Sequence, residues 1–276
     1  MRRRDQLHAP GKAGLARAAS PAVLAAMLAL APQQAHAQAF LGTPTVPLGN
    51  VTRNVATGTE IISVDSAQAI INWVPNDNAV GGPPINFLPA GNSASFQSGV
   101  GIPYTVLNRI ITADPSRAVA LNGLVSSDAI GSIWFYAPGG LLIGSTAQFD
   151  VGALLLTAND PVGAAGGNPF LTGTSFQLAA ASGSTAGVQI DAGAQIDVAN
   201  YMIAVAPRLT MNGAVTLGFG GSAALVMAED VSFTLNGGLF DISANIGSAA
   251  GGTNTINGSI TGAGGIGGQG VYSRIY

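Results

Sequence analysis

Three aspartates are the residues of this chain best placed to carry out chemistry. Asp150 and Asp197 occupy equivalent positions of an internal repeat, and Asp191 lies near the second of them. A pair of carboxylates can hydrolyse a glycosidic bond, one acting as acid and the other as base or nucleophile. In the structural alternative, each aspartate ends a short strand and accepts hydrogen bonds from backbone N–H groups of the following turn. We favour this turn-capping interpretation.

Most other catalytic side-chain types are confined to the first 37 residues. His8, His36 and Lys12 lie there, and the chain has no cysteine, so residues 38–276 lack all three residue types. Histidine bases, amine nucleophiles and thiolates are therefore missing from that part. We expect a protein that is not an enzyme and that holds no cofactor and no metal. A carbohydrate-active or carbohydrate-binding protein is the alternative.

Charge and cysteine content narrow the classes of partner. Residues 38–276 carry five arginines and twelve acidic residues, a formal charge of −7. Such a chain lacks the basic surface that nucleic acids require, so no nucleic-acid partner is expected. No disulfide can form, and stability must come from packing and backbone hydrogen bonds. The segment Gly264 to Gly270 has neither the acids of a calcium-binding repeat nor the lysine of a phosphate loop.

Aromatic residues offer a further possible binding surface, for sugars. Trp73, Trp134, Phe135 and Tyr136 are the candidates. Adjacent residues of a strand point to opposite faces, so Trp134 and Tyr136 share one face and Phe135 lies on the other. At least one of those faces belongs to the core, and we expect core packing for most of the four.

The elements that must position these side chains are short β-strands. Only 8% of the residues are charged, 47% are hydrophobic and 39 are glycine, and no segment after the first 37 residues has the spacing of an amphipathic helix. Apolar residues alternate instead, as in Ile196/Val198 and Leu209/Met211. This period of two predicts strands with one buried face.

An internal repeat predicts how the strands are arranged. The segment Gly140 to Ala158 recurs at an offset of 47 as Gly187 to Ala206, and one extra residue restores the match near its end. Such repetition is typical of a solenoid, in which each coil buries its apolar face against its neighbours. The repeat therefore favours a stack of parallel coils.

Asn-Gly pairs give a second interval along the chain. They begin at residues 122, 212, 236 and 257, and the last three are 24 and 21 residues apart, close to one coil. The offset of 47 is then interpreted as about two coils. We expect these glycines, such as Gly213, at coil corners with positive φ. Antiparallel hairpins are the alternative, because Asn-Gly also favours two-residue turns.

The first 37 residues have the composition of a secretory signal peptide. Basic residues precede an apolar run from Ala18 to Ala31, and Ala35-His36-Ala37 forms a small-residue cleavage site. The apolar run is shorter than the ~20 residues that a membrane-spanning helix needs. The expected organisation is a signal peptide over 1–37 and one β domain over 38–276.

Several short motifs, in their order and spacing, resemble a known family between residues 60 and 160. They are Ile71-Asn72-Trp73, Val106 to Ile110 followed by Asp114-Pro115-Ser116, Leu121-Asn122-Gly123, and Ala137 to Gly144 followed by Asp150 to Gly152. This combination resembles the N-terminal secretion domain (haemagglutination activity domain) of filamentous-haemagglutinin-like exoproteins in two-partner secretion systems of Gram-negative bacteria.

The resemblance implies a fold, a function and a partner. The fold is an all-β, right-handed parallel β-helix with an N-terminal β cap. The function is that of a non-enzymatic secretion domain of an adhesin-like exoprotein, secreted or exposed at the cell surface. The partner is a dedicated outer-membrane transporter with periplasmic domains and a barrel. A longer passenger beyond Tyr276 is expected, and could meet a host or neighbouring cell.

On this resemblance, six residues are candidates for recognition by the transporter: Asn108, Arg109, Asn122, Gly123, Pro138 and Gly140. The family's usual Asn-Pro-Asn-Gly appears here as Ala137-Pro138-Gly139-Gly140. Both asparagines of that motif are therefore replaced.

The leader generates a first prediction. We expect cleavage after Ala37, because small residues at 35 and 37 fit the peptidase site. N-terminal sequencing of the exported protein should begin at Gln38. A different first residue would contradict the assignment.

Overall fold

The computed structural model describes residues 38–162, 175–236, 239–245, 255–262 and 274–276. The expected signal peptide and the segment Gly264 to Gly270 lie outside these ranges. No described residue is in an α-helix, so this part contains no helix able to cross a membrane. The predicted all-β class is confirmed.

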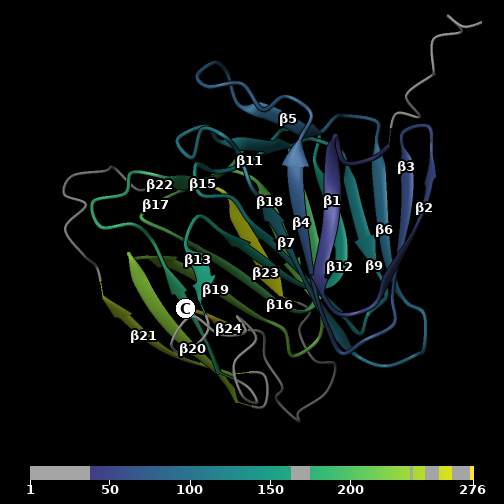
Figure 1. The fold of residues 1–276 in the computed structure, drawn as a ribbon. Coiled ribbons are helices and arrows are strands. Elements are labelled where there is room, and N and C mark those ends of the chain that lie inside the picture. Colours follow the sequence, from purple (N-terminus) through teal and green to yellow (C-terminus); the bar gives the residue numbers. More distant parts are fainter. Residues whose placement is uncertain (1–37, 163–174, 237–238, 246–254, 263–273) are drawn as a thin grey trace, which may run out of the picture. The chain divides into compact units, whose positions relative to one another are not determined.

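Most strands wind into a parallel β-helix with three faces (Figure 1). Face 1 contains β3 (Thr59–Val64), β6 (Ser93–Ser98), β9 (Leu124–Ser127), the first parts of β12 (Gln148–Thr157) and β16 (Gln195–Ala206), β18 (Ala214–Leu217) and β23 (Ser259–Gly262). Face 2 contains β4 (Gln68–Pro75), β7 (Tyr104–Ile110), β10 (Gly131–Tyr136), the second parts of β12 and β16, β19 (Ser222–Met227) and β24 (Arg274–Ile275). Face 3 contains β5 (Ile85–Leu88), β8 (Val119–Leu121), β11 (Gly140–Ile143), β15 (Gly187–Ile190), β17 (Arg208–Met211) and β22 (Thr255–Ile256).

The internal repeat corresponds to strands that pair directly. Gly140 pairs with Gly187 between β11 and β15, and Asp150 pairs with Asp197 between β12 and β16. The register of β12 and β16 then shifts by one residue after Val151, which is the extra residue seen in the sequence. The repeat is confirmed, but the interpretation of 47 residues as about two coils is wrong. It is one coil that contains an insertion.

Two insertions build a separate antiparallel sheet beside the β-helix. Its strand order is β13 (Asp160–Val162), β14 (Ser175–Ala179), β20 (Asp230–Asn236) and β21 (Leu239–Asn245). A coil without an insertion is short: 22 residues separate the paired Val119 and Leu141. The outer sheet packs on face 2, where Phe176 and Phe233 bury Trp134 and Leu155 in a second apolar cluster.

The Asn-Gly pairs have two different structural roles. Asn212 and Asn257 stack at one corner, with Asn257 Nδ2 donating to Asn212 Oδ1 at 3.2 Å. Asn236, in contrast, ends β20 and pairs with Leu239 of β21, so the hairpin alternative holds for that pair. Gly237 itself lies outside the described residues.

Gly213 shows why a corner needs glycine. The expected positive φ is wrong, since Gly213 does not adopt one. A Cβ atom there would lie 2.8 Å from Ile190 Cγ2 and 2.9 Å from the carbonyl oxygen of Ala194. Real Cβ contacts are not this short, so the requirement comes from the close approach of the neighbouring coil.

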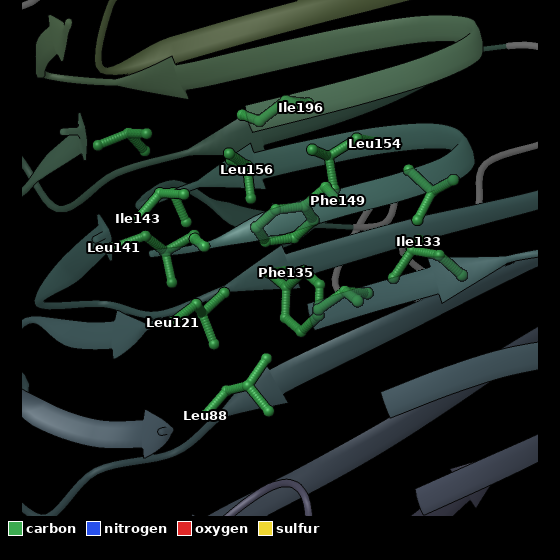
Figure 2. Close-up of a cluster of buried hydrophobic side chains, with 14 of the residues drawn as sticks. Leu88, Leu121, Ile133, Phe135, Leu141, Ile143, Phe149, Leu154, Leu156 and Ile196 are labelled. Carbon is green, nitrogen blue, oxygen red and sulfur yellow. The ribbon is translucent and has the colours of Figure 1, made fainter. Parts of the chain in front are cut away.

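The interior of the β-helix is a continuous apolar core. Figure 2 shows side chains from the three faces, among them Leu121, Ile143 and Phe149, pointing into the space that the coils enclose. In-register parallel pairing places equivalent residues above one another, as with Ile143 and Ile190. Each coil therefore buries its apolar residues against the next, as a solenoid requires.

The N-terminal end of this core is closed by a plug and two cap strands. Phe40 is fully buried, and its ring centroid lies 5.1 Å from those of both Trp73 and Phe87. The strands β1 (Gly42–Leu48) and β2 (Val51–Ala56) pair antiparallel with β4 and β3. Pro44 and Pro47 lie in the edge strand β1, and the lack of an N–H on proline disfavours pairing with another chain.

Polar contacts fix the segment that carries the plug. Leu41 N donates to Phe87 O at 2.7 Å, and Asn92 Nδ2 donates to the backbone carbonyl of Ala39 at 3.1 Å. Arg53 pairs with the buried Glu60 and lies over the Trp73 ring, 4.9 Å from its centroid. The first described residues thus belong to the core of the domain.

Truncation of the plug should destabilise the whole domain. Phe40→Ala is expected to lower the free energy of unfolding by roughly 3–5 kcal/mol, because a buried phenylalanine is lost and a cavity remains. Val46→Ala, at an exposed position of β1, is the matched control and should stay within about 0.5 kcal/mol of wild type. Urea unfolding measures both. Equal stabilities for the two variants would contradict the plug assignment.

Candidate functional site

The motifs around Trp73 and Asn108 meet inside the β-helix. β4 and β7 are parallel neighbours, and Trp73 Nε1 donates to Asn108 Oδ1 at 3.1 Å. Asn108 Nδ2 donates in turn to the Trp134 carbonyl at 3.2 Å. Asn108 is fully buried. In the folded domain its side chain therefore satisfies two core polar groups and is not presented to a partner.

The neighbouring residues of the same motifs point outward. Asn72, Arg109 and Tyr136 pair in register across β4, β7 and β10, so they form one column on the outer surface of face 2. The Arg109 guanidinium lies over the Tyr136 ring, 5.5 Å from its centroid. Arg109 Nη2 donates to both carboxylate oxygens of Asp160 on β13, at 2.7 and 2.8 Å. This pair ties the outer sheet to the β-helix.

The electrostatics of the column follow from partial burial. Burial raises the pKa of Asp160 above its usual value, and Arg109 opposes that rise. Burial, followed by the nearby Asp160 charge, raises the pKa of Tyr136 to about 12, again against Arg109. The column therefore contains the Arg109–Asp160 salt bridge and, at neutral pH, one neutral phenol.

Pro138 and Gly140 lie at the corner between faces 2 and 3. Gly140 has a φ of 99°, and a Cβ there would lie 2.3 Å from the Gly187 carbonyl oxygen, so only glycine fits. Pro138 lines a groove of about 750 Å³. Tyr136 and Asp160 contribute to the same groove. This corner therefore adjoins the Arg109 column.

A second network fixes the loops at the same corner. Arg117 is buried and donates to both carboxylate oxygens of Asp77, at 3.2 and 2.8 Å, and to the Pro83 carbonyl. Asp114 Oδ2 accepts from Gly81 N at 2.8 Å. The turn that begins at Asp114 is thereby joined to the loop between β4 and β5.

Asn122 and Gly123 lie at a different corner, between faces 3 and 1. Asn122 Nδ2 donates to Asn86 Oδ1 at 3.2 Å. A Cβ on Gly123 would lie 2.4 Å from the Asn92 carbonyl oxygen, so the glycine allows close stacking of coils. The six recognition candidates are thus divided among the core, the Arg109 side and this corner.

The three aspartates considered for catalysis do not form a cleft. Asp150 and Asp197 pair side by side on the outer surface of face 1, and both are exposed. Their expected turn-capping role is wrong, because neither ends a strand. Asp191 lies at a corner and accepts from Gln189 Nε2 at 2.7 Å. Among the described residues no three His, Cys, Asp or Glu side chains could hold a metal.

The aromatic candidates are mostly core residues. Trp73 and Phe135 lie inside the β-helix, and Trp134 is buried under the outer sheet. Tyr136 is the half-buried one, on the same outer surface as Trp134, as alternation predicts.

Asp160 is the site residue that sequence reasoning missed. It is 51 positions from Arg109 and belongs to an insertion that breaks the repeat. Asp160 directly precedes Pro161, and no sequence pattern around it predicts contact with a residue of β7. The two residues meet only because the coil returns to face 2 before the insertion begins.

The sequence matches no protein family model and no curated protein. The fold is similar to that of the crystal structure of the HMW1 secretion domain from Haemophilus influenzae, with a TM-score of 0.55 and 17% sequence identity. The match covers 80% of this chain and 52% of that one, so it spans about half the length of the known structure. The likeness is one of fold.

Asp160 generates a prediction on pH. Its pKa is raised in the folded state, so the folded state binds this proton more tightly and stability contributed by it is lost as pH rises through the folded pKa. Relative to Asp160→Asn, wild type should lose stability as the pH rises from the ordinary aspartate range through the raised pKa of Asp160, by on the order of 1 kcal/mol or less because the pair is partly exposed. Urea unfolding across this range measures it. Asp150→Asn is the exposed control. An increase in the stability of wild type relative to Asp160→Asn as the pH rises would contradict the prediction.

Proposed function

We propose that this chain is a non-enzymatic secretion domain, exported across the inner membrane and then through a dedicated outer-membrane transporter. The observation that carries the proposal is the capped parallel β-helix, whose fold is similar to that of a known secretion domain. The motifs between residues 60 and 160 support it independently, because the structure brings several of them together at one end of the β-helix. The adhesin-like passenger and the location at the cell surface belong to the same proposal.

The placement of Asp150 and Asp197 supports a non-enzymatic role. Asp150 and Asp197 lie on an exposed strand surface and do not line the groove beside Pro138. A glycosidase needs carboxylates on both sides of a bound sugar. No specific observation favours the carbohydrate-active alternative.

The six recognition candidates divide into two kinds under this proposal. Arg109 and Pro138 lie at the surface near the groove, and Asn122 lies at the corner between faces 3 and 1, where a transporter could contact them. Asn108, Gly123 and Gly140 act by building the fold that presents those residues. Substitutions of the second kind would impair export through misfolding and not through lost contacts.

The proposal predicts dependence on one transporter. Deletion of the gene for the cognate outer-membrane transporter should leave the protein in the periplasm, with its leader removed, and plasmid-borne transporter should restore secretion. Immunoblots of medium, cell surface and periplasm measure this, with a periplasmic enzyme as the fractionation control. Unchanged secretion in the deletion strain would contradict the proposed route.

A further inference from the structure

The outer surface of β4 and β7 carries an uncovered apolar pair. Val74 on β4 and Ile111, directly after β7, are 45% and 46% exposed. Trp73 pairs with Ile110, and Ile111 N donates to Trp73 O at 2.8 Å, so the parallel register brings Val74 and Ile111 side by side. The outer sheet covers the apolar column further along face 2, including Leu107 and Trp134, but leaves this pair exposed.

An arginine with unused hydrogen-bonding capacity lies beside the apolar pair. Arg109 uses a single nitrogen, Nη2, for both oxygens of Asp160, and its other N–H groups have no partner in the part of the chain that the structure describes. Asn72 Oδ1 has no hydrogen-bond partner among those residues, but it is buried and is therefore shielded from a docked polypeptide as well. Asn72 and Arg109 are neighbours in register, two positions along their strands from Val74 and Ile111.

The surface is held in a fixed shape. Arg117 and Asp114 pin the two loops that follow β4 and β7, and Ala113 N donates to Asn78 Oδ1 at 2.6 Å. Loss of side-chain and loop freedom on binding costs affinity, and a fixed surface reduces that cost. The four residues Asn72, Val74, Arg109 and Ile111 therefore form a preorganised patch, termed here the β4–β7 patch.

We propose that the β4–β7 patch docks a polypeptide that presents a carboxylate to Arg109 and an apolar side chain to Val74 and Ile111. Resting on the proposed function, this polypeptide is the periplasmic part of the outer-membrane transporter. The carboxylate follows from hydrogen-bonding complementarity, since Arg109 donates to Asp160 through Nη2 alone and its other N–H groups have no partner among the described residues. Arginine is enriched among the residues that contribute most at protein interfaces, and the fully buried centre of an interface is more apolar than the rest of the surface.

Addition of a strand to the edge of the sheet is a less suitable mode of docking. The edge strand β1 beside β4 contains Pro44 and Pro47, which cannot donate backbone hydrogen bonds. Side-chain contact with the outer surface of β4 and β7 does not use that edge.

The test compares matched aspartate substitutions on two faces of the same protein. Val74→Asp and Ile111→Asp alter the patch, and Ile61→Asp is the control, because Ile61 is 38% exposed on the outer surface of face 1. The exported protein, purified after leader removal, is titrated onto the full-length transporter in detergent micelles. Circular dichroism and thermal unfolding verify that each variant is folded as wild type.

We expect Val74→Asp and Ile111→Asp to weaken binding by at least about tenfold and Ile61→Asp to leave it unchanged. Asp160→Asn, which frees Arg109 from its internal partner, should bind more tightly. Wild-type affinity in both patch variants, or an equal loss in Ile61→Asp, overturns the location of the patch. Weaker binding by folded Asp160→Asn overturns the proposal that the partner presents a carboxylate to Arg109. Failure of wild type to bind the transporter overturns the proposed function itself.

Discussion

In-register stacking of parallel coils is the constraint on which the rest of the structure depends. A coil of 21 or 22 residues cannot bury its own apolar side chains, so each must align with the coil before and after it. Pairing of Gly140 with Gly187 keeps that alignment across an insertion. The chain can therefore extend a coil outward freely, provided that it returns at the matching residue. Both insertions leave from the end of face 2, which brings them together as one sheet.

Strand alternation separates the part of each motif that builds the fold from the part that meets solvent. Trp73 and Asn108 bond to each other inside the β-helix, whereas Asn72 and Arg109 lie side by side outside it. The inner pair supplies a buried donor and acceptor to each other, which a low-dielectric core requires. Of the outer pair, Arg109 donates to Asp160 on the outer sheet. Similarity in these motifs can thus result from the requirements of folding alone. A transporter that binds the folded domain would contact the outward-facing residues.

Periodic features of the fold were predictable from the sequence, and the contacts that the insertions make were not. Alternation and the repeat predicted the β-helix, because both report on a regular buried face. Gly213 was correctly predicted at a corner, but the predicted reason, a positive φ, was wrong. The Asn-Gly pair indicates a turn, whereas the structural reason is the neighbouring coil, where Ile190 Cγ2 would lie 2.8 Å from a Cβ on Gly213. Asp150 was wrongly predicted to cap a turn at the end of a short strand. Apolar alternation in the sequence does not show where a strand ends, and β12 continues past Asp150 to Thr157. The Arg109–Asp160 pair joins residues 51 positions apart without a shared pattern.

The surface around Arg109 is assembled from several segments of the chain, and this limits the kind of partner that can bind it. Asn72, Arg109 and Tyr136 come from three successive coils, and Asp160 comes from an insertion. In an unfolded chain these side chains lie far apart, and none of the motifs contains all of them. A partner that reads the assembled surface therefore meets at least the first three coils in their folded arrangement. A partner that binds the extended chain must instead read continuous segments, such as Asn108-Arg109, whose asparagine is available only before the core forms.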